Sequence, residues 1–125
     1  MIKVPISNGE LLDKITILQI KRVKIKDEEK QKHIIRELEE LTMLMKTIPM
    51  NEIDNLYKEL KEINNQLWDV EDVLRDKERS ATFDNEFIQL ARKVYFTNDK
   101  RSQVKLKMNQ ISKSELVEVK SYEKY

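Results

Sequence analysis

The stretch from Ile53 to Leu74, IDNLYKELKEINNQLWDVEDVL, carries the clearest apolar repeat in the chain. Its large apolar side chains recur every three or four residues, at Ile53, Leu56, Leu60, Ile63, Leu67, Val70 and Leu74. This spacing aligns them along one side of an α-helix, the side that packs against other helices. The stretch therefore predicts a long helix in an all-α protein.

Trp68 lies off this apolar side. By the same spacing of three and four residues, it shares the opposite side of the helix with Asn65, Asp69 and Asp72. A lone tryptophan among acids on a polar surface typically contacts something outside its own core. These four residues are therefore a candidate binding surface.

The composition describes one helical domain that covers residues 1–125. One glycine, two prolines and 38% charged residues leave little material for loops. A net charge of +1 offers no general attraction for nucleic acid or anionic lipid, and no apolar run approaches the roughly 20 residues of a membrane span. The absence of cysteine excludes disulfides and thiolate metal sites, and it suits a cytoplasmic protein.

Start and stop signals divide the chain into about four long antiparallel helices, as in a bundle. The first helix follows a capping box formed by Ser7 and Glu10 and extends to about residue 26. Asp27 caps a second helix that Pro49 ends, and Asn51 caps a third that reaches about residue 79. Asp84 caps the fourth, whose pattern breaks over residues 97–101, so this region is either one long helix or two.

The same patterns predict how the helices are arranged. The first helix is apolar on most sides, so we expect it at the centre. The very short connection at Pro49 predicts that the second and third helices form an antiparallel hairpin. Residues 2–6 and 116–122 alternate between apolar and polar side chains, which predicts short extended arms that could pair as strands.

Two further groups of polar residues stand where apolar ones are expected. Asp13 and Lys14 lie in the first helix, and a buried charge there requires a partner, so we expect an ion pair to a neighbouring helix. Asn98 and Arg101 fall on the inner side of the fourth helix, where Arg101 requires a carboxylate such as Asp72 or Glu71. Convergence of these groups with the Trp68 surface would form a polar pocket between helices.

Four strings of sequence together resemble an uncharacterised family of small bacterial and phage proteins, classified as a domain of unknown function. The strings are ISNGELLDKITIL (residues 6–18), LWDVED (67–72), YFTNDKR (95–101) and SELVE (114–118). The resemblance spans nearly the whole chain. It implies no established activity or cofactor, but it falls on the same three groups of residues.

Two helical enzyme families offer weaker resemblances. All-helical nucleoside triphosphate pyrophosphohydrolases hold Mg²⁺ through a Glu-Glu-x-x-Glu motif and a Glu-x-x-Asp motif. Glu37 and Glu40 match part of the first motif and Asp69 with Asp72 resembles the second, but Arg36 replaces an expected Glu.

The second enzyme family is the helical chorismate mutases, which also begin with a long helix of similar apolar and basic rhythm. That chemistry needs several cationic groups around a dicarboxylate, and only Lys14, Arg22 and Arg101 are available for it.

These observations favour a soluble binding or assembly module that acts as a homodimer, because long helices in a small chain often leave apolar ridges for a partner to cover. In this interpretation Trp68 anchors the partner surface. The alternatives are a Mg²⁺-dependent pyrophosphohydrolase-like enzyme with Asp69, Asp72, Glu37 and Glu40 as ligands, and a chorismate mutase-like enzyme.

Overall fold

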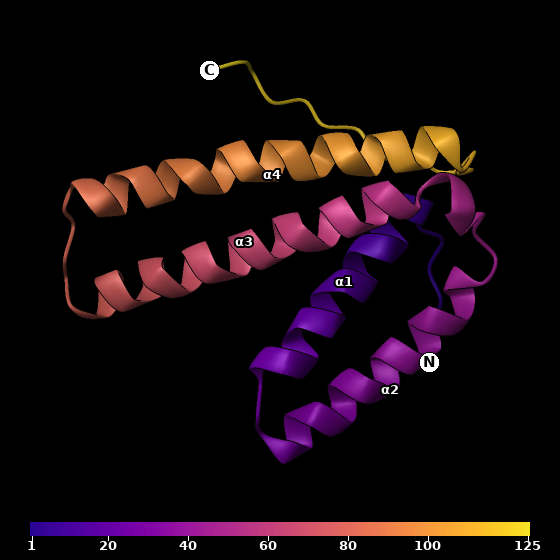
Figure 1. Ribbon diagram of the computed structural model, residues 1–125, viewed down its shortest axis with the longest axis horizontal. Coiled ribbons are helices and arrows are strands. Elements are labelled where there is room, and N and C mark those ends of the chain that lie inside the picture. The colour runs from indigo at the N-terminus through magenta and orange to yellow at the C-terminus, as the bar shows by residue number, and fades with distance from the viewer.

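The computed structural model describes residues 1–125 and contains helices but no strands (Figure 1). The α-helices are α1 (Asn8–Lys24), α2 (Glu28–Met45), α3 (Asp54–Arg79) and α4 (Asn85–Ile111), and a short 3₁₀-helix, η1 (Met50–Glu52), precedes α3. The predicted all-α class with four helices is confirmed. The polar break at residues 97–101 does not divide the last helix, which is continuous. No helix is both long and apolar enough to cross a membrane.

Side-chain caps begin three of the four α-helices, as their sequences predict. Ser7 Oγ accepts a hydrogen bond from the Glu10 backbone N–H at 3.1 Å, and Asp27 and Asp84 cap α2 and α4 in the same way. The predicted cap of the third helix is wrong. Asn51 lies within η1, and α3 begins after Ile53 without a side-chain cap.

The helices form two pairs, α1 with α2 and α3 with α4, and α1 is central because it also packs against both α3 and α4 (Figure 1). The predicted hairpin of the second and third helices is wrong, since α2 and α3 are not among the packed pairs. The reason lies in their connection. Ile48 and Ile53 on either side of η1 are both buried in the core, so the short link is anchored there rather than folded into a tight turn.

One core of twelve buried apolar side chains joins α1 to the other elements, and its members are Leu11, Leu12, Ile15, Leu18, Ile34, Leu38, Ile48, Ile53, Leu60, Ile63, Val104 and Met108. This core ends before the turn that joins α3 to α4. No residue between Glu71 and Phe96 is buried, and Figure 1 shows this end of the α3–α4 pair extending past α1 and α2. We call residues 71–96 the distal hairpin.

The two ends of the chain do not pair as strands, so that expectation is wrong. Side chains join them instead, because Ser114 Oγ accepts a hydrogen bond from the Asn8 backbone N–H at 2.9 Å. Residues 115–125 then run back along α4 as an extended segment (Figure 1). The two ends of the chain are therefore held together by polar contacts rather than by a β-sheet.

Candidate functional site

Asp13 is the centre of a polar network between three helices. It lies on α1 with a side chain that is only 1% exposed. Its Oδ1 accepts hydrogen bonds from Asn64 Nδ2 of α3 at 2.8 Å and from Arg101 Nε of α4 at 2.9 Å, and its Oδ2 pairs with the second Arg101 nitrogen. This two-point contact is the strong geometry of an arginine–carboxylate pair. One carboxylate thus links α1, α3 and α4.

Lys105 adds a second cation, itself buried, one helical turn after the half-buried Arg101. Its ammonium group lies 2.7 Å from Glu10 Oε2, 3.5 Å from Asp13 Oδ2 and 3.2 Å from Glu118 Oε2. The first two carboxylates come from α1, and Glu118 comes from the C-terminal segment. Lys105 therefore extends the network from the buried helices to the surface segment that covers them.

The charges in this network shift each other's protonation equilibria. Burial raises the pKa of Asp13, but hydrogen bonds from Arg101 and Asn64, with the positive charges of Arg101 and Lys105, outweigh it, so its pKa lies below the ordinary value. The hydrogen bond to Asp13 raises the pKa of Arg101. Burial alone would lower the pKa of Lys105, yet its contacts with Glu10 and Asp13 raise it overall. All three groups are therefore held in their charged forms.

The only glycine of the chain allows α1 to approach α4 at this site. The Gly9 backbone N–H donates a hydrogen bond to Asn109 Oδ1 at 2.7 Å. A Cβ atom at this position would lie 2.8 Å from the backbone carbonyl oxygen of Lys105. Close contact at the start of α1 places Glu10 and Asp13 within reach of the α4 cations, because both lie within the next turn of the helix.

Asp13, Asn98 and Arg101 come together from the residues singled out in the sequence. Asn98 Oδ1 accepts a hydrogen bond from Arg101 Nη1 at 3.2 Å. The suggested partner of Arg101, Asp72 or Glu71, is wrong, because the first turns of α1 lie against this part of α4 and present Asp13 instead. Lys14 is exposed and lies 3.9 Å from Glu10, so it takes part only at the surface.

The residues of the Trp68 surface do not join this network. Asn64, not Asn65, supplies the contact from α3. Asp69 forms an exposed ion pair with Lys24 at 3.6 Å, and Trp68 is half-buried. Two of the three groups of polar residues therefore converge, and the third remains a separate surface on α3.

Four members of the network were missed from the sequence, namely Glu10, Asn64, Lys105 and Glu118. Lys105 stands four residues after Arg101 and next to Val104 on the inner side of α4, and that spacing was the available signal. Glu10 was identified only as part of a helix cap. Glu118 had no signal, because its position depends on the path of an irregular segment.

The side chains that each of the two enzyme resemblances requires do not come together in the structure. No three His, Cys, Asp or Glu side chains gather as metal ligands, so Asp69, Asp72, Glu37 and Glu40 do not form a four-carboxylate site. The three cations that the chorismate mutase interpretation requires also have different neighbours. Arg101 binds Asp13, while Arg22 lines a hollow beside α2 with Leu38 and Lys46.

The arrangement is suited to holding helices in register. Three carboxylates, of Asp13, Glu10 and Glu118, surround two cations, and each carboxylate contacts at least one of them. A buried charge is costly unless it is paired and hydrogen-bonded, and here those conditions are met. The network therefore cross-links α1, α3, α4 and the C-terminal segment.

Three of the four strings that carry the family resemblance supply this network. ISNGELLDKITIL contributes Glu10 and Asp13, YFTNDKR contributes Asn98 and Arg101, and SELVE contributes Glu118. Neither the curated proteins nor the solved structures provide a match to the chain. A family of unknown function, DUF6165, matches residues 2–125, which is nearly the entire length. The chain therefore belongs to this family of unknown function, DUF6165.

Proposed function

We propose that this protein is a helical assembly module that acts as a homodimer through its distal hairpin. One observation carries the proposal. The distal hairpin consists of long, regular helices, yet none of its residues is buried. Helices of globular proteins are stabilised mainly by burying an apolar side, and this segment has no third helix to bury it against.

The distal hairpin presents the apolar side chains that such an interface needs. Val73 on α3, Phe83 in the turn and Ile88 on α4 are 38%, 57% and 52% exposed. Two helices alone form a single layer, whereas two hairpins packed together form a four-helix bundle with its own core. A second copy supplies a matching hairpin without requiring any other protein.

Complementary charges favour a second copy as the partner. Lys93, Lys100 and Lys107 recur every seven residues along α4, all are exposed, and none forms an ion pair within the chain. We call them the lysine stripe. Asp69, Asp72 and Asp76 share one side of α3 next to Trp68, and we call them the acidic stripe. Asp69, Lys100 and Lys107 lie just outside the distal hairpin, so the proposed interface extends from the hairpin onto the adjoining turns of both helices. In this arrangement a two-fold axis sets the acidic stripe of each copy against the lysine stripe of the other.

The first test is the mass of the protein in solution. We expect sedimentation equilibrium to give twice the 15.0 kDa chain mass for the wild type and for Met43→Glu, and one chain mass for Ile88→Glu. Met43 is a matched control because it is an apolar residue with 66% exposure on α2, a helix that is not among those packed against α3 and α4. A monomeric wild type, or equal dissociation of the two variants, would rule out the proposed interface.

The second test examines the two stripes. One variant replaces the acidic stripe with lysines, and another replaces the lysine stripe with glutamates. Each variant alone should be monomeric, because like charges then face each other at both contacts. Mixing the two should restore a heterodimer, since opposite charges again meet at both contacts. A mixture that stays monomeric would show that the stripes do not face one another.

A further inference from the structure

The C-terminal segment reverses direction at a single unusual residue. Lys113 follows the end of α4 with φ of 56°, in the left-handed region that glycine normally occupies at helix ends. The turn is closed by a hydrogen bond from the Ser114 backbone N–H to the Asn109 carbonyl at 2.9 Å. A side chain disfavours this conformation, so the turn that folds the segment back onto α4 is strained.

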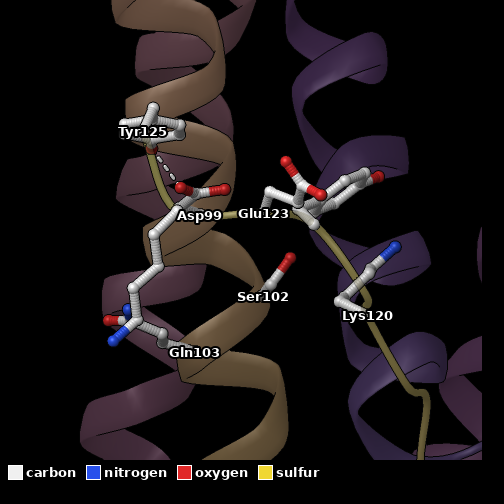
Figure 2. A pocket seen from close by; sticks show the side chains of 8 residues that line it. Asp99, Ser102, Gln103, Lys120, Glu123 and Tyr125 are labelled. Carbon is white, nitrogen blue, oxygen red and sulfur yellow. Dashed lines mark hydrogen bonds between the residues drawn. The ribbon is translucent and has the colours of Figure 1, made fainter.

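Residues 114–125, which we call the tail, contact α4 through side chains at two points. Glu118 pairs with Lys105 at 3.2 Å. Seven residues later, Tyr125 donates a hydrogen bond to Asp99 (Figure 2). The ring of Tyr125 also lies 4.9 Å from that of Phe96. We call the part of α4 that makes these contacts, Phe96, Asp99 and Lys105, the seat of the tail. One charge pair and one aromatic contact fix the direction and the register of the tail on it.

The tail is otherwise held loosely. Its residues from 115 to 125 form no backbone hydrogen bond with the helices. A hollow of about 400 Å³ lies between the tail and α4, with Ser102 and Gln103 on the helix side and Lys120 and Glu123 on the tail side (Figure 2). Tyr125 itself is 69% exposed. Removing the tail from its seat therefore breaks few contacts.

We propose that the seat on α4 is an exchange site that binds the tail of a second copy of this chain. The same Glu118 and Tyr125 contacts form whether the tail comes from its own chain or from another. Opening the turn also lets Lys113 leave the left-handed region, so exchange relieves a strain that the closed form retains. The seated tail meets the distal hairpin only at the last residues of that hairpin, Tyr95 and Phe96, and the inference does not rest on the proposed dimer.

The absence of cysteine makes a direct test possible. One chain carries Ser102→Cys on the helix side of the hollow, and an isotope-labelled chain carries Glu123→Cys on the tail side. After the two are mixed and equilibrated, a short thiol cross-linker should produce a covalent heterodimer, identified by mass, in excess of both like-with-like products. A chain with both cysteines reports the closed tail. If only that doubly substituted chain is cross-linked, exchange does not occur.

Matched variants separate a seated tail from random collision. Glu118→Gln in the tail donor should reduce the mixed product, whereas Glu115→Gln, which removes a charge without a contact to Lys105, should leave it unchanged. Lys113→Gly should reduce it about fivefold, because glycine relieves the strain of the closed turn. A mixed product insensitive to Glu118→Gln would overturn the proposal.

A final cross-linking experiment distinguishes tail exchange from the proposed dimer. The same mixture is repeated with Ile88→Glu in both chains, which disrupts the distal hairpin interface if that interface exists. The mixed product should persist, because the tail seat is intact. Its loss in this background would show that exchange is not a separate interaction.

Discussion

The two halves of the α3–α4 pair have similar helices and opposite surroundings. In the half next to α1, Leu60, Ile63, Val104 and Met108 belong to the common core, and Asp13 reaches Asn64 and Arg101 across it. In the distal hairpin the helices continue without interruption, but no side chain is buried. The apolar pattern of a helix therefore indicates which side can be buried, while a third helix decides whether burial happens.

The difference also separates two kinds of interaction. Near α1, polar and charged groups are buried and paired, so they fix which helices meet and in which register. In the distal hairpin, Arg75 with Glu71 and Arg79 with Asp76 are ion pairs of exposed groups, which contribute little to stability. Substitutions in the two halves should consequently have very different effects.

The largest expected effect comes from the centre of the buried network. Asp13→Ala leaves Arg101 and Lys105 without their shared carboxylate in a buried setting. We expect the free energy of unfolding to fall by about 3–5 kcal/mol, the usual result of removing one member of a buried pair. Chemical denaturation followed by circular dichroism measures it. Asp72→Ala serves as the control, and a similar loss there would contradict the comparison.

A matched pair of apolar truncations tests the two halves of α3. Leu60→Ala removes a fully buried core side chain and should lower the free energy of unfolding by about 2–5 kcal/mol. Val73→Ala, in the distal hairpin of the isolated chain, should change it by only about 0.5 kcal/mol. The same denaturation experiment should be made at low protein concentration, where a dimer would not mask the difference. Equal losses would mean that the distal hairpin is buried in solution.

Substitution of Gly9, the only glycine, should lower the free energy of unfolding by a smaller amount. Gly9→Ala places a Cβ atom 2.8 Å from the Lys105 carbonyl oxygen, so α1 must move away from α4. We expect a loss of about 1–3 kcal/mol from this overpacking. In an open helix the same change would stabilise by about 1 kcal/mol, so a gain in stability would show that the close approach is absent.

Lowering the pH should have the smallest effect on the free energy of unfolding. Protonation removes the charge of Asp13 but leaves its side chain in position beside Asn64. The pKa of Asp13 is lowered in the folded protein, so its charge stabilises the fold above the ordinary aspartate pKa of 3.8. That contribution is lost as the pH falls below this value and through the lower folded pKa. Denaturation midpoints between pH 6 and the acid range should show a steeper decline for wild type than for Asp13→Asn. If the midpoints of the two proteins fell in parallel with pH, the charge of Asp13 would not contribute to stability.

Local structure was largely predictable from the sequence. The caps at Ser7, Asp27 and Asp84 each satisfy a backbone N–H within three residues, and such short-range contacts do not depend on the rest of the fold. The buried charge of Asp13 and the inward position of Arg101 also followed from helical spacing. That each would need a partner was therefore predictable from local pattern.

Which residues would meet was not predictable in the same way. The short link at Pro49 indicated a hairpin, but Ile48 and Ile53 are buried together in the core and turn α3 away from α2. This choice brings Asp13 rather than Asp72 to Arg101. Glu118 lies in an irregular segment without periodicity, so no pattern could place it beside Lys105. Long-range pairing depends on competing packing energies that a single helix does not reveal.

The contact between Asp13 and Arg101 joins residues that are 88 positions apart in the chain. A ribosome adds roughly 5–20 residues per second, so α1 emerges about 4–18 seconds before its buried partner exists. During that interval α1 can contact first α2 and then α3, whose Asn64 reaches Asp13, but the charge of Asp13 has no arginine partner. The α3–α4 pair, in contrast, closes through a local turn as soon as α4 is made. The central helix is therefore the first to be made and the last to have all of its packing partners.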